Sequence, residues 1–255
     1  MADAGAESDC CFALPLLPGR VGEARDLWKK LHEDRAEEFG QYLRETGISR
    51  LLIFLQSLPG GEFLVTLLGT TGGIRPAFEK GMTSASPMAK YLRESYADLT
   101  SIDFSSQRNV PDLEMLRYWE DYEREGLSSV RSAFAIPIRP GKTDSVRRFF
   151  AALEGGKIGD EAPIFHYQTV GKIESFLQHR PEGDYLVEYV ESAKPIREVM
   201  RMGLGSGKPL SDFIRKEFSE FCDLPLPLAP DIDLIYEWDG NMRGPGGATG
   251  MARTG

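Results

Sequence analysis

The sequence predicts an α+β fold made of two tandem repeats, each with the element order βαββαβ. Three observations predict it. The segment FALPLLPGR at Phe12 returns as FAIPIRPGK at Phe134, an offset of 134 − 12 = 122 residues. The same offset superposes the stretch from Phe54 on the stretch from Phe176 without a gap. Strand and helix patterns follow one another in that order along the first half. A period this long indicates two homologous domains rather than a solenoid.

The ends of the two repeats match at a slightly shorter spacing. An offset of 230 − 111 = 119 residues aligns PDLEML at Pro111 with PDIDLI at Pro230, and Trp119 with Trp238. The repeats therefore differ by three residues in one loop. We expect five regions, of which the two tails are predicted to be disordered: tail 1–9, ferredoxin-like repeat 10–121, linker 122–129, ferredoxin-like repeat 130–240 and tail 241–255.

The first repeat opens with an apolar strand at 11–17, closed by a Pro-Gly pair. A helix is predicted next from apolar residues at helical spacing: Ala24, Leu27, Trp28 and Leu31. The apolar positions from Phe39 either extend this helix or begin a second one, before Gly47 ends it. Two strands at 49–57 and 62–69 form a hairpin around Pro59.

A helix at 87–99 and a strand at 113–119 complete the repeat. This order is that of the ferredoxin-like split βαβ unit, in which two helices cover one face of a four-stranded sheet. Both faces of the hairpin strands are apolar, so the second face also needs a cover. The sheet of the other repeat can supply that cover, and we expect the two sheets to form one barrel within the chain.

The hairpin pattern FLQxxPxG[ED][FY]LV occurs at Phe54 and Phe176. With the element order and repeat size, it resembles the dimeric α/β-barrel superfamily, which includes antibiotic-biosynthesis monooxygenases, small polyketide cyclases and muconolactone isomerases. The resemblance covers roughly residues 10–240. It implies the barrel fold and an enzyme that acts on a small organic molecule. Fused two-repeat members include chlorite dismutase-like haem proteins, so the resemblance also leaves a haem protein open.

The composition limits the classes of partner that the protein can be expected to bind. The net charge is −9, and Lys and Arg are scattered among Asp and Glu, so no basic stripe is available for nucleic acid. The longest apolar run, 51–55, is far shorter than a membrane span of ~20 residues. We expect a cytoplasmic protein with a small-molecule substrate and no membrane partner; a homo-oligomer stays open. The three cysteines match no metal-ligand spacing and are expected to be buried thiols.

Matched positions that differ in polarity indicate where chemistry could lie. Leu52 corresponds to Glu174, Thr66 to Glu188 and Leu67 to Tyr189, so the second repeat is the more polar one. The alternative is that this repeat simply has a more polar surface.

The turn RPEGD at Arg180 predicts a three-residue hairpin loop with Gly183 in the left-handed conformation. In that register Phe176 faces Glu188, and Glu174 lies diagonal to Glu188 on one sheet face, about 7 Å away. Two carboxylates this close on a covered face favour one protonated partner, which is a general acid/base arrangement. A structural ion-pair network is the alternative.

The sequence thus predicts Glu174 and Glu188 as catalytic residues. The predicted substrate-binding residues are these: His166, Tyr167, Phe176, Gln178 and Tyr189. The glycine-rich segment 155–163 is either a lid over this site or a surface loop.

The leading interpretation is an isomerase, cyclase or cofactor-independent monooxygenase that acts on a largely apolar molecule by carboxylate proton transfer, without cofactor or metal. A non-catalytic ligand-binding or assembly module is the first alternative, and a haem- or metal-binding protein is the second. An absorption spectrum, a metal analysis and a ligand-bound structure would separate these classes.

Overall fold

The computed structural model describes residues 7–121, 130–154, 169–223 and 231–240. The predicted linker 122–129, the segment 155–163, His166, Tyr167 and the tail from residue 241 lie outside these ranges. The chain divides into two compact units. The first unit contains the residues up to Pro111 together with those from Asp233 on, and the second runs from Asp112 to Ile232.

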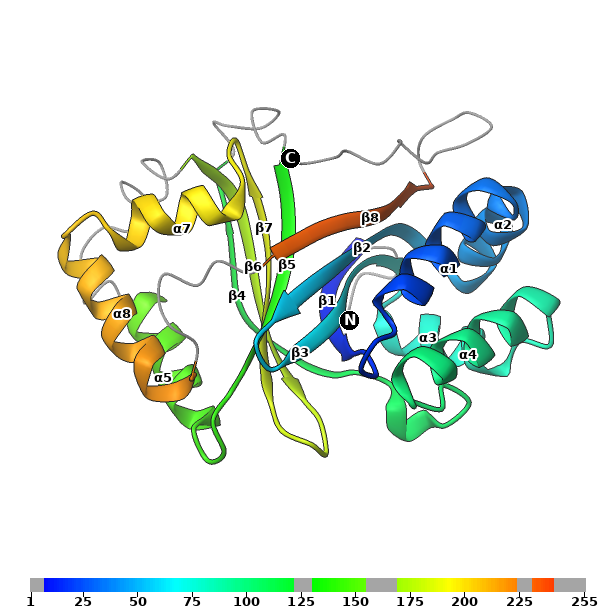
Figure 1. Ribbon diagram of the computed structural model, residues 1–255, viewed down its shortest axis with the longest axis horizontal. Helices are drawn as coiled ribbons and strands as arrows, with labels where there is room; N and C mark the ends of the chain where they lie inside the picture. Colours follow the sequence, from blue (N-terminus) through cyan, green and yellow to red (C-terminus); the bar gives the residue numbers. More distant parts are fainter. Residues whose placement is uncertain (1–6, 122–129, 155–168, 224–230, 241–255) are drawn as a thin grey trace. The chain divides into compact units, whose positions relative to one another are not determined.

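Each unit contains one four-stranded sheet with helices on one of its faces (Figure 1). The order in the first sheet is β1-β3-β2-β8, and β3 pairs antiparallel with both of its neighbours β1 and β2. The elements of this unit are β1 (Glu7–Pro15), α1 (Val21–Glu33), α2 (Ala36–Thr46), β2 (Ile48–Leu58), β3 (Gly61–Thr71), α3 (Ile74–Thr83), α4 (Pro87–Thr100), the 3-10 turn η1 (Gln107–Asn109) and β8 (Asp231–Asp239).

The second sheet has the order β4-β6-β7-β5, with antiparallel pairing between all neighbours. Its helices also lie together on one face (Figure 1). The elements are β4 (Asp112–Glu120), β5 (Val130–Pro137), α5 (Thr143–Glu154), β6 (Val170–His179), β7 (Tyr185–Ser192), α7 (Ile196–Leu204) and α8 (Pro209–Phe221). The α+β class predicted from the sequence is confirmed.

Local signals set several element ends. The helical region after β1 is two helices, and Gly47 ends the second with φ +82°, a left-handed conformation that favours glycine. Ser86 caps α4, because its hydroxyl accepts a hydrogen bond of 3.1 Å from the Ala89 amide, and Pro87 fills the first helical position. The predicted tail 1–9 is corrected in part, since Glu7 already pairs with Thr71 as the first residue of β1.

The last strand of each sequence repeat belongs to the sheet of the other unit. Strand β4, at the end of the first repeat, pairs with β6, and β8 lies beside β2. The Asp121 amide donates to the Gly171 carbonyl at 2.8 Å, and the Gly240 amide donates to the Ser49 carbonyl at the same distance. These two bonds are equivalent in the repeats. The sequence predicted each strand in its own repeat, because an apolar pattern indicates a strand but not which sheet edge it joins.

A salt bridge fastens β4 to a helix of the second unit. The guanidinium of Arg147 on α5 donates to both carboxylate oxygens of Glu114 on β4, with Nη2 2.8 Å from Oε2. A bidentate pair of this kind sets orientation as well as attraction. The exchanged strand is therefore held by side chains in addition to its ladder with β6.

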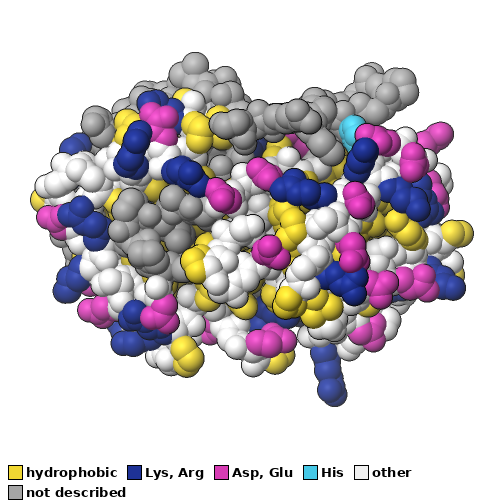
Figure 2. Space-filling model, in the orientation of Figure 1, with side chains coloured by type: hydrophobic (Ala, Val, Ile, Leu, Met, Phe, Trp, Pro, Cys, Tyr) yellow, Lys and Arg dark blue, Asp and Glu magenta, His cyan; other side chains and the backbone are white. Residues whose placement is uncertain are grey.

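The surface of the described residues carries both signs of charge, with Lys and Arg interspersed among Asp and Glu on the face shown in Figure 2. The three cysteines are buried thiols, as expected. Among the described residues, no helix is long and apolar enough to cross a membrane.

Candidate functional site

The hairpin register of the second unit is one residue away from the predicted one. Ser175, not Phe176, lies opposite Glu188, and the last ladder pair before the turn is Gln178 with Tyr185. The turn contains a bond of 3.1 Å from the Gly183 amide to the Arg180 carbonyl, and Gly183 has φ +140°, a positive value that favours glycine as predicted. That bond closes a turn with two central residues, one fewer than the three assumed, which moves every cross-strand partner by one position.

The predicted carboxylate pair is wrong for this reason. Successive side chains of a strand point to opposite faces, so Glu188 shares the face of Ser175, and Glu174 lies on the other one. Glu174 is 2% exposed there and forms an ion pair of 2.9 Å with Lys172 Nζ. Glu174 and Glu188 therefore cannot share a proton.

Most of the predicted substrate-binding residues follow Glu174 to that other face. Phe176 and Gln178 share the face of Glu174, because they follow it at every second position of β6. Tyr189 lies directly opposite Glu174 on β7. All three are buried, and none lines the cavity that contains Glu188. Of the predicted site residues that the structure describes, Glu188 alone lines that cavity.

A row of four side chains crosses the second sheet through Glu188. Arg117 on β4 lies opposite Ser175 on β6, which lies opposite Glu188 on β7, which lies opposite Phe134 on β5. The Ser175 hydroxyl donates a hydrogen bond of 3.1 Å to Glu188 Oε1. Sequence reasoning missed Ser175 and Arg117, although both satisfy the rule that identified Glu188.

That rule was a change of polarity between matched positions. Ser175 corresponds to Ile53 at the offset of 122, and Arg117 corresponds to Tyr236 at the offset of 119. The row Arg117, Ser175 and Glu188 is thus a feature of the second unit alone.

Burial dominates the electrostatics of this row. It raises the pKa of Glu188 from the ordinary value of 4.5 to about 6, while the Ser175 hydrogen bond and the positive charge of Arg117 act in the opposite direction. Arg117 is itself only 8% exposed. A carboxyl group with this pKa changes its protonation state close to neutral pH, as a general acid or base requires.

The face that carries Glu188 borders a cavity of ≈ 120 Å³ between the sheet and helices α5, α7 and α8. Its walls are mainly apolar, with Phe149 and Phe150 from α5, Met200 from α7 and Phe218 from α8. An apolar cavity of about 150 Å³ is enough to take up benzene. The space therefore suits a molecule of about one ring, or one ring of a larger molecule.

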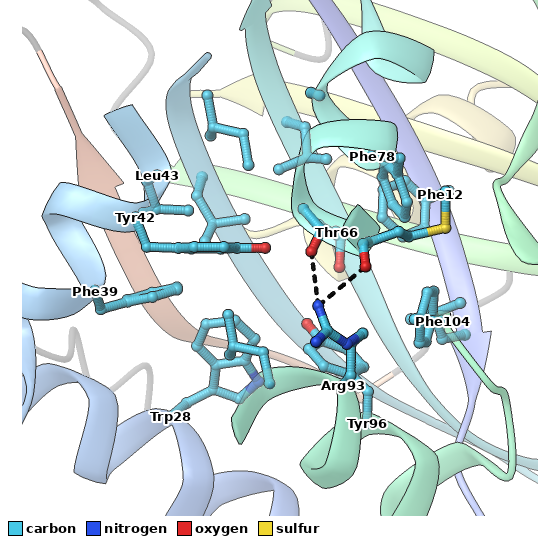
Figure 3. A pocket seen from close by; sticks show the side chains of 18 residues that line it. Phe12, Trp28, Phe39, Tyr42, Leu43, Thr66, Phe78, Arg93, Tyr96 and Phe104 are labelled. Atoms are coloured by element: carbon cyan, nitrogen blue, oxygen red, sulfur yellow. Dashed lines mark hydrogen bonds between the residues drawn. The ribbon is translucent and has the colours of Figure 1, made fainter. Parts of the chain in front are cut away.

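The first unit has a cavity of the same volume, ≈ 120 Å³, at equivalent positions (Figure 3). Phe12 corresponds to Phe134 and Thr66 to Glu188, and both members of each pair line their cavities. The carboxylate of one cavity is therefore a hydroxyl in the other. The two cavities share their position in the fold and differ in their polar groups.

The remaining histidine of the second unit belongs to a surface ion-pair network. His179 Nδ1 is 3.0 Å from Asp184 Oδ1, and its Nε2 is 3.9 Å from Glu114 Oε2. It does not line the cavity of Glu188. Within the described ranges, no group of three His, Cys, Asp or Glu side chains is arranged to hold a metal ion.

Comparisons with known proteins define the fold more than the family. No protein-family model and no curated protein matches the sequence. Among solved structures, an anthrone oxidase-like protein is 10% identical, with 95% of this chain and 96% of that chain covered and a TM-score of 0.52.

Two proposed monooxygenases are also similar. One, from Fusobacterium nucleatum, is 9% identical with 90% of each chain covered and a TM-score of 0.45. The other, from Lactobacillus acidophilus, is 12% identical with 89% and 91% covered and a TM-score of 0.40. At such identities, it is the fold of the anthrone oxidase-like protein that this chain is shown to share.

Proposed function

We propose that this chain is an enzyme that moves a proton on a small, largely apolar organic molecule bound in the cavity of the second unit, with Glu188 as the general base. The observation that carries the proposal is a carboxyl group with a pKa of about 6 on the wall of an apolar cavity. Burial of a carboxylate costs folding free energy, so a buried carboxyl group with a raised pKa on a cavity wall is a candidate for chemistry.

Ser175 and Arg117, the neighbours of Glu188 in its row, orient the base and stabilise the negative charge that forms on the substrate. Ser175 donates to one carboxylate oxygen and so orients the base. The guanidinium of Arg117 lies two strands away in the same row and supplies the positive charge that an enolate or phenolate oxygen requires. The base takes a proton from an acidic C–H or O–H bond, and the electron pair of that bond moves to the oxygen stabilised by Arg117. Return of the proton to another carbon is an isomerisation.

We further propose that the two units are a duplicated ferredoxin-like repeat of the dimeric α/β-barrel type. The matched offsets, the equivalent hydrogen bonds of Asp121 and Gly240, and the equivalent cavities support a duplication. The shared fold of an anthrone oxidase-like protein is consistent with a substrate of the aromatic ketone class. Oxygenation would be a later step, in which molecular oxygen takes one electron from the carbanion and the two resulting radicals combine, so that a C–O bond forms and the product is a peroxide.

The test measures proton abstraction directly. The protein is incubated in D2O with 2-indanone, a bicyclic ketone with acidic C–H bonds, and deuterium uptake is followed by NMR. We expect the wild type to accelerate uptake and Glu188→Gln to lower the rate by about 10²- to 10⁴-fold, the usual range for loss of a general base.

The matched control is Glu174→Gln, which changes the same residue type on the other face of the same hairpin. Its rate per folded molecule should equal that of the wild type. Equal rates in wild type and Glu188→Gln, or no catalysed exchange at all, would overturn the proposal.

A further inference from the structure

We propose that the cavity of the first unit is a second, non-catalytic binding site, which takes a neutral aromatic molecule carrying one hydrogen-bonding oxygen, such as a phenol. The site is distinct from the cavity of Glu188, and the proposal does not depend on the proposed function.

Two buried polar atoms on residues that line this cavity have no protein partner. Among the described residues, neither Trp28 Nε1 nor Thr66 Oγ1 has a hydrogen-bond partner, and both residues line the cavity. Trp28 is 1% exposed and Thr66 is 2% exposed. A buried polar group left unsatisfied costs about 1–3 kcal/mol, so two in one cavity indicate that something else binds to them.

The fold itself does not require these atoms. The position of Trp28 corresponds to Phe150 in the second unit, where an apolar ring fills the same place on the cavity wall. An indole N–H is therefore not needed for packing between the helix and the sheet. Together, the N–H donor of Trp28 and the hydroxyl of Thr66 match an oxygen that both accepts and donates, as a phenolic hydroxyl does.

The aromatic side chains that line the cavity favour binding of a flat ring. The Phe12 and Phe78 rings meet edge to face with centroids 5.6 Å apart, and Tyr96 meets Phe104 in the same way at 5.3 Å. These rings surround the cavity together with Trp28 (Figure 3). Aromatic pairs gain energy from such edge-to-face contacts beyond their buried area. An aromatic ligand would continue this arrangement.

The charge of the site disfavours a cationic ligand. Among the described residues that line the cavity there is no carboxylate, and Arg93 is the single charged one. Arg93 Nη1 donates to the carbonyls of Gly81, Met82 and Ser84 at 3.0 to 3.1 Å, so it caps the end of α3 (Figure 3). The guanidinium is thereby fixed beside the cavity, where it disfavours a positive ligand.

The tyrosines of the site remain hydroxyl donors at physiological pH. Burial raises the pKa values of both Tyr42 and Tyr96 above the ordinary value of 10. Tyr42 projects into the cavity from α2 (Figure 3). A Cβ atom at Gly81 would lie 2.7 Å from the Tyr42 hydroxyl oxygen, so glycine at that position leaves room for the hydroxyl. No group here has the carboxyl chemistry of Glu188, which makes the site one for binding rather than proton transfer.

The experiment uses the full chain and two fluorinated probes, 4-fluorophenol and fluorobenzene, with binding followed by fluorine NMR. The test variant is Trp28→Phe with Thr66→Val, which removes both polar atoms and places at position 28 the smaller ring that Phe150 provides in the second unit. Fluorobenzene reports any effect of the lost ring volume, because it cannot bind to either polar atom. We expect 4-fluorophenol to bind roughly tenfold more weakly to this variant, as expected for lost hydrogen bonds, and fluorobenzene to bind as before.

Two controls separate this site from the other cavity and from folding. Glu188→Gln should not change the affinity for 4-fluorophenol at the site of Trp28 and Thr66, because Glu188 lines the cavity of the second unit and not this one. Thermal unfolding of the double variant without ligand verifies that it is folded at the assay temperature, because the smaller ring lowers stability while the removal of two unsatisfied groups raises it. Absence of saturable 4-fluorophenol binding at millimolar concentrations, or equal affinity in the folded variant, would each overturn the inference.

Discussion

Ser175 and Glu188 lie directly opposite each other on neighbouring strands, and the Ser175 hydroxyl donates a hydrogen bond of 3.1 Å to Glu188 Oε1. In the first unit the same two positions hold Ile53 and Thr66, which also lie opposite each other. The pairing geometry is therefore common to both units, and the chemistry at the pair is not. This relationship makes the second cavity the candidate active site.

The first prediction concerns the pH dependence of activity. The Ser175 hydrogen bond lowers the pKa of Glu188 against the effect of burial. Ser175→Ala should therefore raise that pKa above 6 and move the acid limb of the kcat/KM profile to higher pH, because the base becomes ionised later. Ser175→Thr, which keeps the hydroxyl, should restore the wild-type profile. An unchanged limb in Ser175→Ala would show that the hydroxyl does not act on the base.

The second prediction concerns stability. The native pKa of Glu188 is raised to about 6 from 4.5, so its contribution to the free energy of unfolding is fully present below pH 4.5 and is lost as the pH rises through 6. The loss is about 2 kcal/mol, from 1.36 kcal/mol for each pKa unit. Glu188→Gln does not ionise and should not show this loss.

Urea unfolding of wild type and Glu188→Gln across this pH range measures the difference. The variant should gain relative stability between about pH 4.5 and 7, while other titrating groups affect both proteins alike. Two parallel stability curves would contradict the raised pKa.

The third prediction concerns the buried ion pair on the other face. Removing the Glu174 carboxylate takes away the ion pair that it forms with the ammonium of Lys172, 2.9 Å away at a largely buried position. Glu174→Leu should therefore lower the free energy of unfolding by about 3 kcal/mol. The leucine itself fits a site of this kind, since Leu52 is fully buried at the matched position.

The double variant Glu174→Leu with Lys172→Met should recover most of that loss, because no unpaired charge remains. Both variants should retain the specific activity of the wild type. A lower activity per folded molecule in the double variant would assign Glu174 a role that its position does not suggest.

Much of the architecture could be predicted because it depends on local patterns. The apolar spacing around Trp28 indicated a helix, and the turn at Pro59 indicated the hairpin. The exchange of β4 and β8 could not be predicted in this way. A strand such as β8 has the same alternation of side chains whichever sheet it joins, so the choice depends on tertiary packing.

The candidate site was predicted only in part, and one turn explains the error. A single-residue difference in the loop at Arg180 moved Glu174 away from Glu188. The repeat contained the information needed to avoid it. Leu58 and Gly61 close the first hairpin, and applying the offset of 122 residues to that pair gives the register observed at Ser175.

The exchanged strands have a consequence for synthesis of the protein. A ribosome makes β1, β2 and β3 early, but β8 is among the last described segments to emerge. Until then the outer edge of β2 has no neighbour, and an open strand edge pairs readily with other chains. The nascent first unit therefore waits until the whole second unit and β8 have been made before its sheet is complete. Slow elongation or early termination would expose that edge to aggregation, and the last strand acts as its cover.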